Sequence, residues 1–232
     1  MGNTFTIPAL LKICIIEDSE IHREWLKTEL IDSPMLKIVS VSSLGRDGIE
    51  SAKKHKPDLV ILDFQLQDMT GLEVAKRIKN YSSNIKIFIL TAHNEASIIE
   101  RIINHRDIDA IAIKGSPYFE INFLTALKHI FEGGTYLDPS LLNNLRRTKN
   151  ITGLNKLTQR EFEVFIQASA GKSDDQIALD LCVEIAHVRN LKSKITKKIK
   201  KDGVSNIILK LANNSHPDSL QQGLLNSLLD AE

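Results

Sequence analysis

Cysteine is scarce in this sequence. Only Cys14 and Cys182 occur among its 232 residues, and both stand in apolar stretches. Two cysteines cannot form the network of disulfides that holds small secreted domains together. A disulfide-held secreted domain is therefore excluded, and the sequence fits a reducing cytoplasm.

Long hydrophobic runs are also missing. No apolar run approaches the roughly 20 residues that a membrane span needs. The opening residues, MGNTFTIPALLK, lack the charged and apolar regions of a signal peptide. We therefore expect a cytoplasmic protein without a membrane partner.

The sequence also lacks an excess of either basic or acidic side chains. The 30 Lys and Arg residues face 29 Asp and Glu residues, which excludes a uniformly polycationic or an acidic disordered chain. The balance is uneven along the chain, because residues 1–132 carry a net charge of −2 and residues 133–232 a net charge of +3. A polyanionic partner is therefore expected for the second half.

The length and the 42% apolar content favour two domains. From Lys12 to Phe131, short apolar runs alternate with segments of helical period, which is typical of a doubly wound parallel sheet with helices on both faces. The five predicted strands are Ile13–Ile16, Ile38–Val41, Leu59–Leu62, Ile87–Leu90 and Ala110–Ile113. The predicted helices lie near residues 20–31, 46–55, 72–80, 95–104 and 119–132.

The second half has a different pattern. Periodicity fades from Gly133 to Asn155, where glycines and Pro139 indicate a linker with room for a short helix. Beyond Leu157 the pattern is all-helical, and two capping boxes open its first two helices. These boxes pair Thr158 with Glu161 and Ser173 with Gln176, and two further helices are predicted from about Ile185 to Lys200 and from Val204 to Leu211.

Polar residues follow four of the predicted strands. They are Glu17 and Asp18 after the first strand, Asp63 after the third, Thr91 after the fourth and Lys114 after the fifth. Each alone is more often a helix cap or a solvated loop residue, but ligands of a parallel sheet bind beyond the carboxyl ends of its strands. The set therefore predicts one shared pocket if the central strands lie side by side.

The chemistry of this set points to phosphoryl transfer. Clustered carboxylates repel one another unless a cation is present, and hard oxygen ligands suit hydrated Mg²⁺. Asp63 can then act as a nucleophile on phosphorus. The metal, Lys114 and the Thr91 hydroxyl would meet the charge of the resulting acyl phosphate.

The blocks IIEDSE, ILDFQLQDMTG, ILTAH and AIAIKG resemble the receiver domain of bacterial response regulators. The resemblance implies a flavodoxin-like receiver domain over residues 12–132, after an N-terminal extension of residues 1–11. It implies that a sensor histidine kinase phosphorylates Asp63 and that Thr91 is the switch hydroxyl. The implied Mg²⁺ ligands are Glu17, Asp18, Asp63 and the carbonyl of Gln65. Gln67 and Ile111 depart from the family, which usually has proline and an aromatic residue there.

A basic stretch without any acidic residue runs from Ala186 to Lys201. Taken alone, such a run is as often a solvated helix face that keeps the protein soluble. Here a short capped helix and a turn at residues 182–184 precede it. This order is the helix-turn-helix arrangement, in which the second helix enters the DNA major groove.

The segment LTQREFEVFIQASAGKSDDQIALDLCVEIAHVRNLKSKITKKI resembles the LuxR-type DNA-binding domain of NarL/FixJ-type regulators, over residues 154–213. Residues 133–153 would be the linker. The expected contacts to double-stranded DNA are His187, Arg189, Asn190, Lys192, Lys194, Lys197 and Lys198. The implied homodimer would form through Val204, Ile207, Ile208 and Leu211. Glu184, His187 and Leu191 replace the family's usual serine, threonine and histidine.

Two functions follow as hypotheses. The first is a transcriptional regulator without enzymatic turnover, in which phosphorylation of Asp63 alters domain packing or dimerisation and so controls DNA binding. The second is an interaction protein whose receiver docks a partner and whose degenerate recognition helix binds DNA without sequence preference. A Leu-rich tail over residues 214–232 either docks on this chain or binds a partner.

Overall fold

The computed structural model describes residues 10–31, 33–147, 154–170 and 172–200. The first unit is built on a parallel sheet of six strands in the order β2-β1-β3-β4-β5-β6. The strands are β1 (Leu11–Ile16), β2 (Leu36–Ser42), β3 (Leu59–Asp63), β4 (Lys86–Thr91), β5 (Ala110–Ile113) and β6 (Tyr136–Leu137). The predicted doubly wound α/β fold is confirmed, and the predicted count of five strands is wrong by one.

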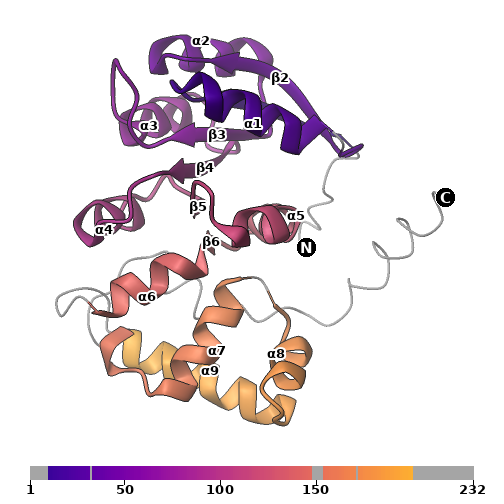
Figure 1. The fold of residues 1–232 in the computed structure, drawn as a ribbon, viewed down its shortest axis with the longest axis vertical. Coiled ribbons are helices and arrows are strands. Elements are labelled where there is room, and N and C mark those ends of the chain that lie inside the picture. The colour runs from indigo at the N-terminus through magenta and orange to yellow at the C-terminus, as the bar shows by residue number, and fades with distance from the viewer. Residues whose placement is uncertain (1–9, 32, 148–153, 171, 201–232) are drawn as a thin grey trace.

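Five helices follow the first five strands in turn, as predicted. They are α1 (Glu20–Ile31), α2 (Gly45–His55), α3 (Gly71–Tyr81), α4 (Ala96–Ile103) and α5 (Pro117–Phe131). Buried residues of α1 and α5 form one core cluster with the sheet, and those of α2, α3 and α4 form another. The helices therefore cover both faces of the sheet (Figure 1).

Alternation along the strands assigns side chains to these two cores. In β1, Ile13 and Ile15 belong to the α1–α5 side, while Cys14 and Ile16 belong to the opposite side. Successive strand residues point to opposite faces, so a strand covered on both sides must be apolar at every position. This is why the strands appear in the sequence as unbroken runs of Ile, Leu and Val.

The sixth strand lies where the sequence predicts a linker. Residues Tyr136–Leu137 pair with Ala110 and Ile111 of β5, and the chain continues as α6 (Pro139–Arg147). The short helix expected near Leu141 is thus confirmed. The linker prediction misses β6, because a two-residue strand between glycines and a proline carries no measurable periodicity.

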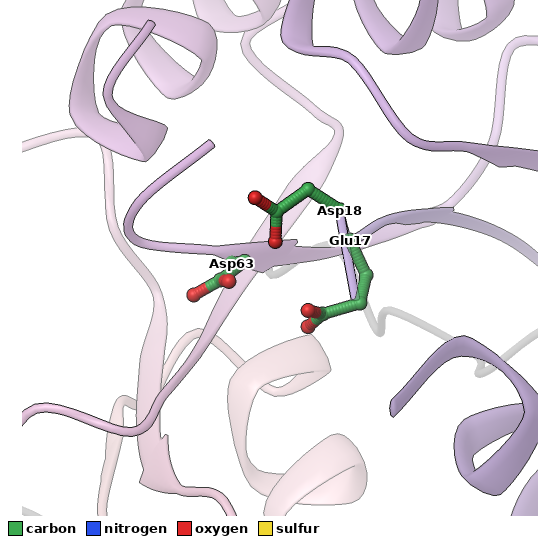
Figure 2. Close-up of side chains that lie close together, drawn as sticks. All are labelled: Glu17, Asp18 and Asp63. Atoms are coloured by element: carbon green, nitrogen blue, oxygen red, sulfur yellow. The ribbon is translucent and has the colours of Figure 1, made fainter. Parts of the chain in front are cut away.

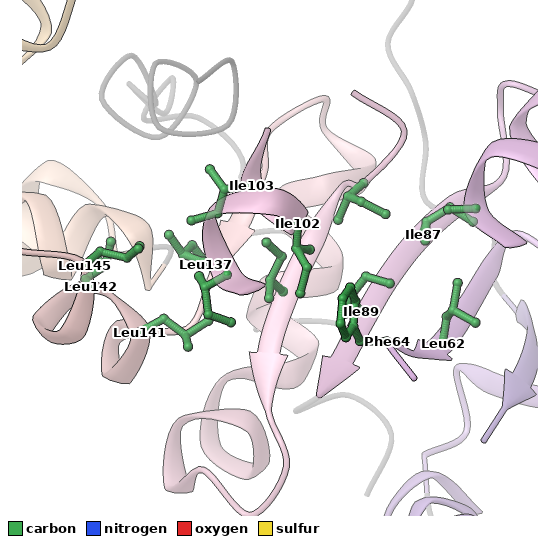
Figure 3. Close-up of a cluster of buried hydrophobic side chains, with 14 of the residues drawn as sticks. Leu62, Phe64, Ile87, Ile89, Ile102, Ile103, Leu137, Leu141, Leu142 and Leu145 are labelled. Carbon is green, nitrogen blue, oxygen red and sulfur yellow. The ribbon is translucent and has the colours of Figure 1, made fainter. Parts of the chain in front are cut away.

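Helix α6 joins the sheet to the second unit. Its residues Leu141, Leu142 and Leu145 are buried in the same cluster as Ile102 and Ile103 of α4 (Figure 3). It contacts α4 and β5 on one side and η1 (Leu154–Lys156) and α7 (Gln159–Ser169) on the other. One continuous apolar core therefore connects the two units.

The second unit is all-helical, as predicted. After η1 and α7 come α8 (Asp174–Asp180) and α9 (Ile185–Lys200). Both predicted capping boxes are present, at Thr158 with Glu161 and at Ser173 with Gln176. The turn before α9 contains Cys182 at a positive φ of 51°, and α8 and α9 pack on each other. The helix-turn-helix arrangement is confirmed.

Some predictions lie outside the described residues. They are the N-terminal extension up to residue 9, the helix that contains Val204, Ile207, Ile208 and Leu211, and the Leu-rich tail. Within the described part of the chain, every helix is too short or too polar to cross a bilayer.

Candidate functional site

The predicted strand-end residues meet at the carboxyl edge of the sheet. Glu17 and Asp18 follow β1, and Asp63 ends the neighbouring strand β3. One carboxylate oxygen from each of the three lies within 4.8 Å of the others (Figure 2). Glu17 and Asp63 are buried, while Asp18 is half-buried. The three carboxylates therefore form an acidic pocket with one side open to solvent.

Lys114 supplies the cation of this pocket. Its Nζ lies 2.7 Å from Oε2 of Glu17 and 2.9 Å from Oδ2 of Asp63. Only 7% of its side chain is exposed. A buried charge pair of this kind holds its geometry because each partner is costly to leave alone. Lys114 thus bridges the two carboxylates and leaves Asp18 at the solvent side.

Burial raises the pKa of the Glu17 carboxyl above its ordinary value. The negative charge of Asp63 acts in the same direction, while the hydrogen bond from Lys114 opposes it. A further cation at the pocket would favour the charged form of Glu17. The donor set consists of carboxylate oxygens with one open side, which fits a hard divalent cation that keeps part of its hydration shell.

Thr91 and Gln65 border the same pocket. The fully buried Oγ1 of Thr91 accepts a hydrogen bond from the main-chain N–H of His93 at 3.0 Å. The main-chain N–H of Gln65 points to Oδ1 of Asp63 at 3.4 Å. The side-chain oxygen of Gln65 also lies 2.9 Å from Nε2 of His93. The loops after β3 and β4 are therefore tied together above Asp63.

The loop after Asp63 is anchored at its far side. Asp68 accepts hydrogen bonds from the main-chain N–H groups of Gly45 and Arg46, at 2.8 and 3.0 Å, at the start of α2. A Cβ at Gly71 would lie 2.4 Å from the main-chain oxygen of Asp63, so only glycine lets α3 begin this close. The loop that contains Gln67 is thus fixed at both ends.

Three pocket residues were not predicted from the sequence. The Nδ1 atom of His22 lies 3.6 Å from Glu17 and 3.5 Å from Nζ of Lys114. Arg23 donates to the main-chain oxygens of Glu17 and Asp18, each at 2.7 Å. His93 is the third. The seven histidines show no metal-ligand spacing in the sequence. The one signal that could have placed His22 and His93 at the pocket is that they follow Asp18 and Thr91 closely in the sequence.

A second candidate site is the exposed face of α9. His187, Asn190, Lys194 and Lys197 are exposed at helical positions i, i+3, i+7 and i+10, and Arg189 flanks them. The opposite face of α9 is buried through Val188, Leu191, Ile195 and Ile199. The exposed face therefore carries positive charge and hydrogen-bonding groups, which suits a polyanion.

Two of the predicted DNA contacts lie off this face. Lys192 is buried, and its Nζ lies 2.5 Å from Oδ1 of Asp174. The prediction that Lys192 contacts DNA does not fit the structure, because position 192 lies beside the buried face of α9. Lys198 is partly exposed and pairs with Glu161 at 2.6 Å. Leu191 is also buried and packs in the core of the helical unit.

Comparisons with known proteins agree with both units. Residues 13–114 match the sequence profile described as "Response regulator receiver domain". The chain is 29% identical over 203 residues to the response regulator protein VraR of Staphylococcus epidermidis, which covers 87% of this chain and 90% of VraR. It is 29% identical over 190 residues to the transcriptional regulatory protein DesR of Bacillus subtilis, which covers 82% of this chain and 90% of DesR.

A solved structure extends the likeness to the fold of both units. The response regulator RcsB in its DNA complex aligns with a TM-score of 0.55 and 20% identity. The alignment covers 89% of this chain and all of RcsB. At this identity the comparison concerns the fold alone.

Proposed function

We propose that this chain, whose residues 13–114 match the response regulator receiver domain, is a DNA-binding transcriptional regulator controlled by phosphorylation of Asp63. The phosphoryl donor is a sensor histidine kinase, and the DNA-binding unit is the helical unit with α9 as its recognition helix. The observation that carries the proposal is the bridge that Lys114 makes between Glu17 and Asp63.

The donor set at the pocket suits Mg²⁺. Glu17, Asp18, Asp63 and the main-chain carbonyl of Gln65 would hold the ion, and the three carboxylates already lie within 4.8 Å of one another. When bound, the ion supplies positive charge to the oxygens of the phosphoryl group. The open side at Asp18 leaves room for ligands from water or phosphate.

Asp63 performs the transfer as a nucleophile. A carboxylate oxygen of Asp63 forms the new bond to phosphorus while the bond between phosphorus and the imidazole nitrogen of the kinase breaks. The bonding electron pair leaves with that nitrogen. The ammonium of Lys114, now 2.9 Å from Asp63, can then pair with a phosphoryl oxygen, and the Thr91 hydroxyl can donate to another.

A chain of hydrogen bonds leads from the pocket to the start of α6. The main-chain N–H of Lys114 donates to the main-chain oxygen of Thr91 at 2.8 Å. One residue earlier, the N–H of Ile113 donates to the buried carboxylate of Asp138 at 3.3 Å. Asp138 also binds both the N–H and the hydroxyl of Ser140 at the start of α6. Movement at the ends of β4 and β5 would therefore shift α6 and the helices packed on it.

Control of dimerisation is the expected output. The face of α9 that carries Arg189, Asn190 and Lys194 is exposed, so the receiver unit does not cover it. Phosphorylation would then act by bringing two copies together on two DNA half-sites rather than by uncovering α9. We propose that the homodimer forms through Val204, Ile207, Ile208 and Leu211.

Intact mass tests the phosphoryl step. The full chain is treated with acetyl phosphate in the presence of Mg²⁺, and the mass of one phosphoryl group should appear. Asp63→Asn and added chelator should each abolish the labelling, whereas Asp47→Asn, a change at an exposed acid, should preserve it. Labelling of Asp63→Asn equal to that of the parent protein would overturn the assignment.

One observation favours a second candidate function. Lys192 and Lys198 are neutralised by Asp174 and Glu161, which leaves fewer cations on α9 for phosphates than the sequence predicts. A receiver-based interaction protein with non-specific DNA binding would fit that reduced charge. Selection of binding sites from random DNA distinguishes the two functions, because a sharp consensus supports the transcriptional regulator and a flat pool supports the interaction protein.

A further inference from the structure

A buried carboxylate connects the two helices of the helix-turn-helix arrangement. Asp174 is the first residue of α8, follows the N-cap residue Ser173, and has 6% of its side chain exposed. The positive end of the α8 dipole favours its negative charge. Both of its oxygens bind cations from α9: Oδ1 binds Lys192, and Oδ2 binds Arg189.

The two cations are placed differently. The Nζ of Lys192 lies 2.5 Å from Asp174, and only 10% of the Lys192 side chain is exposed. The Nε of Arg189 lies 3.2 Å from the same carboxylate, yet 56% of the Arg189 side chain is exposed. Lys192 thus compensates the buried charge from inside, whereas Arg189 reaches Asp174 from the exposed face of α9.

The contact orients the guanidinium of Arg189. A guanidinium is planar, and a carboxylate at its Nε fixes the plane and the direction of the edge formed by the terminal nitrogens. That edge matches O6 and N7 of guanine in the major groove, which is the commonest base-specific contact that arginine makes. An arginine that is already oriented loses less conformational freedom on binding.

We infer that Asp174 is a specificity-determining positioning residue, which orients Arg189 to read a guanine in the DNA major groove. The inference rests on the proposed DNA-binding function and deepens it. Asp174 itself touches no base. Its effect on sequence preference passes through Arg189.

A purely structural role for Asp174 makes different predictions. An ion pair that only holds α8 to α9 would change the folded fraction and so weaken binding to every DNA sequence alike. The buried Lys192 already meets the charge of Asp174, and exposed ion pairs add little to stability. A positioning role instead changes the preference at one base pair and leaves non-specific affinity in place.

The test compares Asp174→Asn with Asp175→Asn in the full chain treated with acetyl phosphate and Mg²⁺. Asp175 is the neighbouring residue of α8 and is exposed, so its variant removes the same charge and leaves the pair of Asp174 with Arg189 in place. Binding sites are selected from random duplexes with the parent protein. Each variant is then titrated against the selected duplex, against its single guanine replacements and against a mixed-sequence duplex.

The parent protein and Asp175→Asn should discriminate against loss of one particular guanine by about tenfold. Asp174→Asn should lose most of this discrimination while its affinity for the mixed-sequence duplex stays equal to that of Asp175→Asn. Equal discrimination by Asp174→Asn and the parent protein would overturn the inference and leave the proposed function intact. A parent protein that binds without preference overturns the inference as well, and one that binds no duplex overturns both.

A second variant covers the case in which Asp174→Asn does not fold. Arg189→Lys keeps the charge and the buried pair of Asp174 with Lys192, but it lacks the planar fork. It should lose the same tenfold preference at the same base pair. In the Arg189→Lys background, Asp174→Asn should have no further effect on discrimination. Retained preference in Arg189→Lys, or an independent effect of Asp174→Asn, would show that Asp174 does not act through Arg189.

Discussion

At the scale of single residues, the pocket is set by one lysine among carboxylates. Lys114 lies on the loop after β5, yet it reaches Glu17 after β1 and Asp63 at the end of β3. Without it, two buried carboxylates would face each other unpaired, and an uncompensated buried charge is costly. Lys114 therefore compensates the negative charges of Glu17 and Asp63 as long as no other cation or phosphoryl group is bound in the pocket.

Replacement of this lysine should make the protein depend on Mg²⁺ for stability. Lys114→Met should lower the free energy of unfolding by about 3 kcal/mol in the presence of chelator. Millimolar Mg²⁺ should raise the thermal midpoint of Lys114→Met more than that of the parent protein, because the ion replaces the missing charge. Thermal denaturation with and without Mg²⁺ measures both values. Lys54→Met, at an exposed lysine, is the control, and equal Mg²⁺ shifts in all three proteins would contradict the account.

A pH-dependent contribution is expected from Glu161, which is buried at the start of α7. Burial alone would raise the pKa of this carboxyl, but hydrogen bonds from Lys198 and Thr158 outweigh burial and lower the pKa below its ordinary value. A group with a lowered folded pKa stabilises the protein above its unfolded pKa and loses that contribution as the pH falls through the folded value.

Glu161→Gln should therefore cost about 1 kcal/mol of unfolding free energy at neutral pH, and the cost should vanish well below pH 4.5. Urea denaturation of the parent protein and the variant at several pH values measures it. Glu163→Gln removes the same charge from a more exposed ion pair on α7 and should cost less at neutral pH. A constant difference between Glu161→Gln and the parent protein down to the most acidic pH would show that the charge of Glu161 contributes nothing.

At the scale of elements, α6 is the connection between the two units. Its buried leucines belong to the core that also contains residues of α4 and α7. Asp138 directly precedes α6, and its carboxylate accepts hydrogen bonds from the main-chain N–H groups of Ser140 in α6 and of Ile113 at the end of β5. The helix is thus fixed to the sheet at its start and packed against η1 and α7 of the helical unit along its side.

Loss of packing at α6 should weaken both units together. Leu142→Ala removes a fully buried side chain and should cost about 2–5 kcal/mol of unfolding free energy. Hydrogen exchange should show reduced protection in α4 and in α7 alike. Asn143→Ala changes an exposed neighbour on the same helix and should alter protection little. Reduced protection confined to one unit would mean that the core is not continuous through α6.

The sequence predicts the elements well where pattern and capping agree. The strands read as unbroken apolar runs, and Thr158 with Glu161 marks the start of α7 to the residue. It fails at β6, because two residues carry no period, and at Lys192, because the register of α9 and not its composition decides which lysines are buried. His22 and His93 were missed because their role depends on which loops meet in space.

At the scale of the whole molecule, the proposed function links the acidic pocket to the exposed face of α9. Helix α6 lies between the sheet and the helical unit that contains α9 (Figure 1). Two sites are coupled only if the state of one changes the free energy of binding at the other. For couplings of ordinary size the change in affinity is about fivefold or more.

The most direct test is therefore DNA affinity as a function of the state of Asp63. A duplex chosen by selection from random DNA is titrated with the full chain by fluorescence anisotropy, with and without beryllofluoride and Mg²⁺ as a phosphoryl mimic. We expect the mimic to change the affinity of the parent protein at least about fivefold and to leave that of Asp63→Asn unchanged. The same affinity for the parent protein with and without the mimic, or the same change in Asp63→Asn, would contradict it.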